Sequence, residues 1–197
     1  VVKIYSFQPL CEGTEKTCGW PAGKSMSIAV DIMVEHINKG QFLRGNHTMQ
    51  VDTMDTSCSP QLGLQVASKV LLLPRSDKPF GVLGCGSSAC TKTAASILDI
   101  GRMPTISNSA TSAELSDRVA YPSLFRMFPV DLPQVVSMVI VFQSIGWHSL
   151  ALITDSFGSL GFKDKFDEIV NSRGMTNVLS GKEAAHMAAL VDHDGSL

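Results

Sequence analysis

The sequence has no long apolar run and no strong excess of either charge. Its longest apolar segment, residues 135–145, is interrupted by Ser137, Gln143 and Ser144, and is shorter than the ~18 residues that cross a bilayer. Sixteen basic and 18 acidic side chains give a net charge of −2, so a basic surface for nucleic acid is not expected. With 44% hydrophobic and 17% charged residues, the chain can still bury a core.

Catalytic and metal-binding patterns are also missing from the sequence. The five histidines belong to no catalytic motif that we recognise, and no Cys/His spacing fits a zinc site. A cluster near the end invites a metal interpretation, but a solvated tail explains it better; it consists of His186, Asp192, His193 and Asp194. We therefore expect a non-enzymatic protein without metal or cofactor.

Apolar strands and amphipathic helices alternate along the chain, which is typical of an α/β fold with a parallel sheet. Strands are expected at Val1–Phe7, Thr48–Met54, Phe80–Leu83, Met103–Ile106, Leu124–Phe128, Leu150–Thr154 and, more weakly, Met175–Ser180. Helices are expected at Pro21–Asn38, Ser59–Leu73, Ala89–Ile100, Asp131–Ile145 and Gly161–Arg173. Right-handed crossovers place such helices on both faces of the sheet.

Small hydroxyl residues follow two of the predicted strands. Phe80–Leu83 leads into a Gly-Cys-Gly-Ser-Ser turn, and Met103–Ile106 leads into Ser107–Ser112. Ligands of open α/β sheets bind just beyond the carboxyl ends of the strands. The pattern therefore predicts a small polar ligand held by hydroxyls and backbone N–H groups.

A dinucleotide site is an alternative interpretation of the first turn. Gly84-x-Gly86-x-x-Ala89 has the right spacing, follows a strand and opens a helix. However, the next strand lacks the acidic residue that would hold a ribose, since no acid follows before Glu114. A nucleotide-binding enzyme and a turn that serves only close packing both stay open at this point.

Several sequence blocks resemble the type I periplasmic-binding-like, or Venus flytrap, ligand-binding domain. The most similar members are the extracellular domains of class C G-protein-coupled receptors, of the metabotropic glutamate and B-type GABA kind; guanylyl-cyclase-type and ionotropic receptors share parts of the pattern. The matching blocks are 29–38, 55–58, 84–88, 104–117, Tyr121-Pro122, Phe125-Arg126, 129–131 and Gly146-Trp147.

This resemblance implies an extracellular receptor domain built from two lobes that close on a ligand. Residues 1–128 would form ligand-binding lobe 1, and 129–197 would begin lobe 2 with a truncated or poorly ordered tail. Resembling domains are about twice as long, and a membrane segment is expected beyond residue 197. Resembling receptors dimerise through two lobe-1 helices, which correspond here to Pro60–Leu73 and Thr91–Ile100.

The resemblance also assigns ligand-binding roles to matched positions. The loop serines Ser87 and Ser88 would receive a ligand α-carboxylate, for which a helix N-terminus is favourable. Ser109, Ala110 and Thr111 would hold the carboxylate and the α-amino group. Alternatively, Ser88 is only a helix cap, and Ser109 and Thr111 only satisfy loop backbone.

Two further ligand residues would come from lobe 2, and one position departs from the family. Asp131 would face the amino group, or would cap the helix that it opens, and Phe157 lies near a position where many relatives carry tyrosine. Glutamate-selective relatives have an arginine on the first helix where this chain has Met26, with Lys24 nearby. A neutral amino acid, a GABA-like molecule and another small polar ligand are equally open.

The cysteines and one glycosylation sequon favour an extracellular location. The resemblance implies a Cys18–Cys58 disulfide, with Cys11 as the competing partner. Cys85 and Cys90 could form a local disulfide, although we favour two buried thiols. Asn46-His47-Thr48 is a sequon for N-linked glycosylation of Asn46.

Overall fold

The structure, a computed structural model, describes residues 1–10, 23–150 and 159–177. The chain divides into two compact units, Val1–Pro129 and Val130–Leu197. The boundary falls next to the one expected after residue 128.

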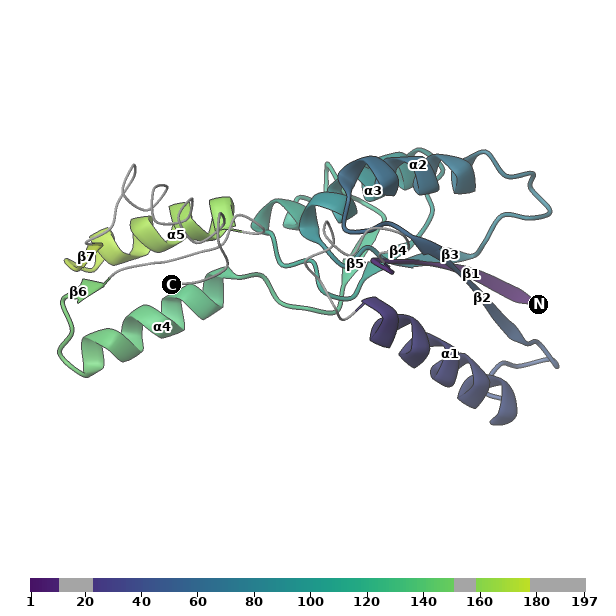
Figure 1. Cartoon of the computed structure of the whole chain (residues 1–197), viewed down its shortest axis with the longest axis horizontal. Helices are drawn as coiled ribbons and strands as arrows, with labels where there is room; N and C mark the ends of the chain where they lie inside the picture. Colours follow the sequence, from purple (N-terminus) through teal and green to yellow (C-terminus); the bar gives the residue numbers. More distant parts are fainter. Residues whose placement is uncertain (11–22, 151–158, 178–197) are drawn as a thin grey trace, which may run out of the picture. The chain divides into compact units, whose positions relative to one another are not determined.

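The first unit is built on a sheet of five parallel strands (Figure 1). The strands are β1 (Val2–Gln8), β2 (Met49–Asp55), β3 (Gly81–Gly84), β4 (Thr105–Ser107) and β5 (Leu124–Arg126). They lie side by side in the order β2-β1-β3-β4-β5, with every neighbouring pair parallel. The predicted α/β class and parallel sheet are therefore confirmed.

Helices cover both faces of this sheet. The helical segments are α1 (Gly23–Lys39), α2 (Pro60–Leu71), α3 (Ser88–Ile100) and the 3₁₀ turn η1 (Ala113–Ser116). Figure 1 shows α1 on one face, and α2 beside α3 on the other. The chain leaves β1 through α1 toward β2 at one side of the sheet, and leaves β3 through α3 toward β4 at the other. This reversal marks the carboxyl ends of β1 and β3 as the expected ligand edge.

Local sequence signals explain where α2 and α3 begin. Ser59 precedes α2 with an extended backbone, and its hydroxyl accepts a hydrogen bond from the N–H of Leu62 at 3.3 Å. Pro60 follows at the first turn, where its missing N–H costs nothing. Ser87 caps α3 in the same way, through the N–H of Cys90.

The main core lies between the sheet and the pair α2 and α3. Side chains of β1 and β3 pack there against the inner faces of both helices. The cluster contains Tyr5, Phe7, Val66, Ala67, Val70, Val82, Cys85, Cys90, Ala94, Leu98 and Met103. This packing fixes the carboxyl end of β3 and the start of α3, which together position the candidate site.

On the sheet face away from α2 and α3, some apolar side chains are exposed to solvent. Ile106 of β4 and Phe125 of β5 are paired in register and are 37% and 53% exposed. On α1, Ile28, Ile32 and Met33 are also exposed.

The second unit contains two helices and a short parallel pair of strands. They are α4 (Leu132–Ser144), β6 (Ser149–Leu150), α5 (Ser159–Ser172) and β7 (Thr176–Asn177). Its own core contains Val135, Val139, Leu150, Phe166, Val170 and Met175. Most of the predicted strand Leu150–Thr154 lies outside the described residues. Among the described helices of both units, none has the length and apolar character to span a membrane.

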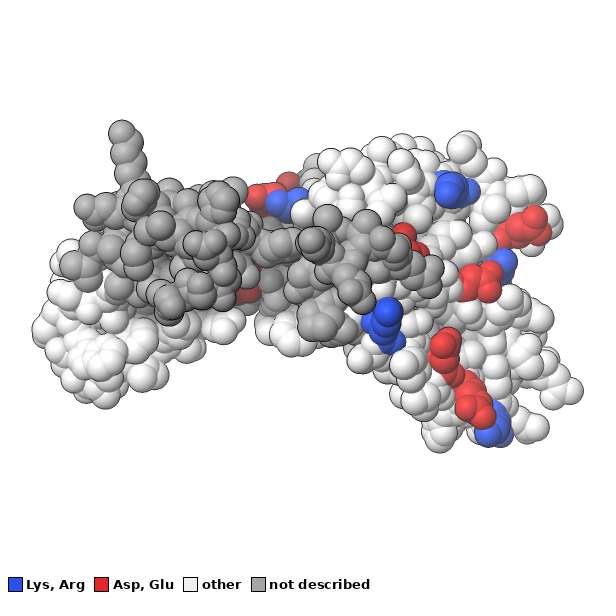
Figure 2. Space-filling model, viewed as in Figure 1, with Lys and Arg blue, Asp and Glu red and all other residues white. Residues whose placement is uncertain are grey.

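Charges of both signs are mixed on the face of the first unit that Figure 2 shows. Ion pairs among the described residues include Lys3 with Asp52 at 2.9 Å, Glu35 with Lys39, and Lys92 with Glu114. The Lys3 ammonium, through its hydrogen bond, lowers the pKa of Asp52.

Candidate functional site

Two loops meet at the carboxyl edge of the sheet, one after β3 and one after β4. The Ser109 hydroxyl donates to the carbonyl oxygen of Gly86 at 2.7 Å. The N–H of Ser112 donates to the hydroxyl of Ser88 at 3.2 Å. Residues that lie more than 20 positions apart in sequence are thus joined into one surface, as the two hydroxyl clusters predicted.

The backbone between β3 and α3 requires glycine at its first position. Gly84 has a φ of +112°, and a Cβ there would lie 2.2 Å from the carbonyl oxygen of Phe7 in the neighbouring strand. The close approach brings the turn against β1, so the glycine serves strand packing.

Ser87 and Ser88 have different roles at the start of α3. Ser87 is the N-cap: its hydroxyl accepts from the N–H of Cys90 and donates to the carbonyl oxygen of Cys58 at 3.4 Å. The capping role considered for Ser88 is therefore wrong. The Ser88 hydroxyl instead contacts the loop after β4 through Ser112.

The loop after β4 is anchored by a buried serine that the sequence interpretation did not single out. Ser107 is 0% exposed, donates to the carbonyl oxygen of Cys85 at 3.1 Å and accepts from the N–H of Ala110 at 3.2 Å. The Ala110 side chain packs with Ala95, Leu115 and Leu124 in a small core. Only the backbone of Ala110 can therefore face a ligand.

Thr111 lies next to this anchored segment and is half-buried. Its hydroxyl has no hydrogen-bond partner among the described residues. In contrast, the hydroxyls of Ser107 and Ser109 are hydrogen-bonded within the two loops. A ligand role for Thr111 stays a prediction.

The first helix reaches the same edge through Met26. The side-chain N–H of Asn108 lies 3.4 Å from the Met26 sulfur, so α1 contacts the loop after β4. Asn108 is a second residue that the sequence interpretation left out, although it sits inside the hydroxyl cluster that was recognised. The side chain next to Asn108 on α1 is thus a thioether and carries no charge.

The remaining predicted ligand residues lie outside the first unit or outside the described residues. Asp131 occupies the N-cap position of α4, but its side chain makes no capping hydrogen bond. The capping interpretation of its carboxylate is therefore wrong, while a ligand role stays a prediction. Phe157 lies outside the described residues.

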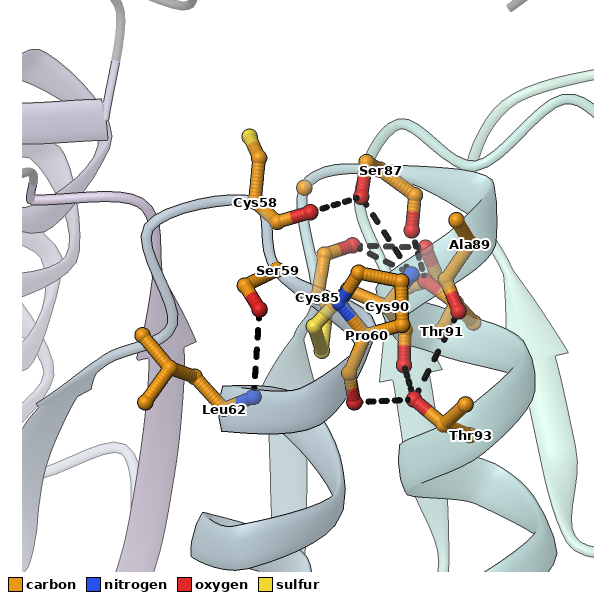
Figure 3. The surroundings of a disulfide bond; sticks show 12 residues. Cys58, Ser59, Pro60, Leu62, Cys85, Ser87, Ala89, Cys90, Thr91 and Thr93 are labelled. Atoms are coloured by element: carbon orange, nitrogen blue, oxygen red, sulfur yellow. Dashed lines mark hydrogen bonds between the residues drawn. A yellow bond between two sulfur atoms is a disulfide. The ribbon is translucent and has the colours of Figure 1, made fainter. Parts of the chain in front are cut away.

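Cys85 and Cys90 form a disulfide, so the two buried thiols that we favoured are not what the structure contains (Figure 3). Their sequence spacing left both states open, whereas the fold brings the strand end and the first turn of α3 to a Cα–Cα distance of 5.8 Å. This distance is in the range that a disulfide spans. Both cysteines are fully buried.

Among the described cysteines, Cys58 has no disulfide partner, and in Figure 3 its side chain points away from the Cys85–Cys90 disulfide. Burial, followed by the negative charge of Asp55, raises the pKa of the Cys58 thiol. Its predicted partner Cys18 and the competitor Cys11 lie outside the described residues, so that pairing stays a prediction. Asn46 is exposed, with a left-handed backbone in the loop between α1 and β2.

Within the described ranges, no group of three or more His, Cys, Asp or Glu side chains could hold a metal ion. The acidic and histidine-rich cluster at 186–194 lies outside them. What the site offers is hydroxyls, backbone N–H groups at the start of α3 and the uncharged Met26 side chain of α1, which suits binding of a small polar molecule.

A family model described as "Receptor family ligand binding region" matches residues 25–187 of this chain. The match includes the loops after β3 and β4, α3 and most of α1. It agrees with the resemblance inferred from the sequence blocks.

Individual receptors are similar to the chain over most of its length. Rat taste receptor type 1 member 3 is 28% identical over 89% of this chain, and human taste receptor type 1 member 1 is 32% identical over 71%. Human metabotropic glutamate receptor 8 is 29% identical over 77%. The matched regions make up only 21%, 18% and 18% of those proteins, so the chain spans about a fifth of their length.

A solved structure has the same fold. An ABC transporter substrate-binding protein from Desulfitobacterium hafniense superposes with a TM-score of 0.72, covering 98% of this chain and 56% of that one, at 18% identity. The periplasmic-binding-protein-like fold expected from the sequence is thereby confirmed.

Proposed function

We propose that this chain, which belongs to the family described as "Receptor family ligand binding region", is part of the extracellular domain of a cell-surface receptor. That receptor would be similar to class C G-protein-coupled receptors. In this proposal the first unit binds a small amino-acid-like molecule. The similar proteins are receptors, and no observation favours the nucleotide-binding enzyme that the Gly84-x-Gly86 turn suggested.

The observation that carries the proposal is the junction of the two loops at the sheet edge. The Ser109–Gly86 and Ser112–Ser88 hydrogen bonds hold the predicted ligand residues of both loops side by side. Thr111 stands at this junction with a hydroxyl that has no partner in the described part of the chain.

The chemistry of these groups suits the two ends of an amino acid. The start of α3 presents backbone N–H groups and a positive dipole end, which favour a carboxylate. The Thr111 hydroxyl can accept a hydrogen bond from an ammonium group. The carboxylate of Asp131, if the second lobe closes over the ligand, would complement the same positive charge.

We further propose that the distal part of the ligand is uncharged. Met26 and Asn108 are the groups that α1 and the loop after β4 bring together. Neither offers a charge to a distal carboxylate, which an anionic side chain would need to replace its hydration.

The receptor context adds three proposals. Ligand binding would shift the equilibrium between open and closed lobes and so signal. Dimerisation would use α2 and α3, and it is supported by exposed apolar side chains there: Leu64 on α2, Leu72 directly after α2, and Ile100 on α3. Glycosylation of Asn46 is supported by its exposed position.

The proposal is tested by thermal stability of the protein with a panel of L-amino acids, GABA, NAD and ATP. We expect an uncharged amino acid or GABA to raise the melting temperature. A rise with NAD or ATP together with none for the amino acids would overturn the receptor interpretation. The same panel on the chain extended beyond residue 197 covers the case in which both complete lobes are needed.

Thr111→Ala should weaken binding of the molecule found in this screen by about tenfold, because a hydrogen bond to a charged group is worth ~1.5 kcal/mol. The melting temperature without ligand should not change, since the hydroxyl has no partner among the described residues. Ser96→Ala, which removes an exposed hydroxyl on α3, is the matched control. Equal affinities of both variants and the unaltered protein would remove Thr111 from the site.

A further inference from the structure

The loop after β4 is held by backbone carbonyls of the loop after β3. The Cys85 carbonyl oxygen accepts two hydroxyl donors, Ser107 at 3.1 Å and Thr91 at 3.2 Å. The next carbonyl, that of Gly86, accepts from Ser109 at 2.7 Å. Two successive peptide groups therefore determine where the hydroxyls of the second loop lie.

These carbonyls belong to a turn that is closed by the Cys85–Cys90 disulfide. The bond connects the end of β3 to the first turn of α3, as Figure 3 shows, and both side chains are fully buried. Helix α2 packs directly on it, because a Cβ at Gly63 would lie 2.6 Å from the Cys90 sulfur. The turn that presents the carbonyls is thus fixed covalently at both ends.

The constraint extends to the residues that would contact the ligand. Ser107 donates to the Cys85 carbonyl and, with the same oxygen, accepts from the N–H of Ala110. The backbone of Ala110, and with it the adjacent Thr111, is therefore positioned by the Cys85 carbonyl through one hydroxyl. Ser88 adds a second connection through the N–H of Ser112.

We propose that the Cys85–Cys90 disulfide and the Ser107 hydroxyl are positioning groups of the ligand site, which hold the segment Ser109–Ser112 in its binding conformation. They act through the Cys85 and Gly86 carbonyls and do not themselves contact ligand. Only the part of this inference that concerns affinity rests on the proposed function.

Hydrogen exchange of individual amides tests the proposal without any ligand. Cys85→Ala/Cys90→Ala and, separately, Ser107→Ala should each accelerate exchange at Ala110 by about tenfold, and the double variant should do the same at Ser112. Ser96→Ala, on the solvent side of α3, should leave both rates unchanged.

Amides of β1 and β2 distinguish positioning from a general loss of stability. A purely structural disulfide would accelerate exchange there by the same factor as at Ala110, and this result would overturn the proposal. Unchanged rates at Ala110 and Ser112 in the double variant would also overturn it. If the double variant does not fold, Ser107→Ala tests the hydroxyl and Cys90→Ala, which also removes the disulfide, tests the covalent constraint by the same comparison of rates.

Binding of L-serine and L-glutamate, measured by thermal shift, separates this inference from the proposed function. If either amino acid stabilises the unaltered protein, the double variant should bind it about tenfold more weakly; equal affinity would contradict positioning for binding. If neither these two amino acids nor the rest of the panel binds, to this chain or to the chain extended beyond residue 197, while exchange at Ala110 accelerates selectively, the proposed ligand class fails and the positioning of the loop stands.

Discussion

Among single residues of the site, Gly84 is the one at which we expect a substitution to lower the free energy of unfolding most. We expect Gly84→Ala to destabilise the protein by more than ~3 kcal/mol, because its φ of +112° is strained for alanine and the methyl would meet the Phe7 carbonyl oxygen at 2.2 Å. Gly45→Ala, also at positive φ but facing only the His47 ring, should cost about 1 kcal/mol. Urea denaturation of both variants measures the two losses of unfolding free energy. Equal losses would contradict a role for the contact between the new methyl group and the Phe7 carbonyl oxygen.

Residue roles were also where prediction from the sequence was weakest. The sequence predicts the hydroxyl cluster, but it offers Ser88 as the alternative cap where the structure has Ser87, because adjacent serines at a helix start are equivalent in sequence. The state of Cys85 and Cys90 depends on the distance between a strand end and a helix turn, which spacing alone does not give. Ser107 was missed as an anchor since its burial follows from the pairing of β4.

At the level of elements, the residues that precede α2, α3 and α4 allow a comparison of capped and uncapped helix starts within one protein. Ser87→Ala and Ser59→Ala remove capping hydrogen bonds of α3 and α2, and each should cost about 1 kcal/mol. Asp131→Ala at the start of α4 should cost less than about 0.5 kcal/mol, because its side chain makes no capping bond. Chemical denaturation measures all three, and a loss for Asp131→Ala as large as for Ser87→Ala would contradict the structure.

The elements themselves were largely predictable. Apolar periodicity placed α2, α3 and α4 within a few residues of their observed bounds, because each helix buries one continuous stripe. The short strands β4 and β5 were found from their apolar residues, although β5 ends at Arg126 and not at Phe128. The turn η1 was not predicted, since three or four residues carry no periodic pattern.

For the molecule as a whole, the exposed apolar residues of the first unit allow a test of dimerisation. We expect Leu64→Glu on α2 to weaken a dimer at least tenfold, because a charge would be buried in an apolar contact. Ile32→Glu on α1, which lies on the other face of the sheet in Figure 1, is the control and should leave association unchanged. Analytical ultracentrifugation distinguishes the two, and similar behaviour of both variants would place the dimer contact elsewhere.

The strand order has a consequence for the timing of synthesis. Strand β1 precedes both of its partners in the sequence: it pairs with β2, which begins at Met49, and with β3, which begins at Gly81. The middle strand of the three is therefore synthesised with both edges unpaired and is enclosed only once β3 has been made. Contacts between such distant segments slow folding, so we expect the edges of β1 to be open to association with other chains during this interval.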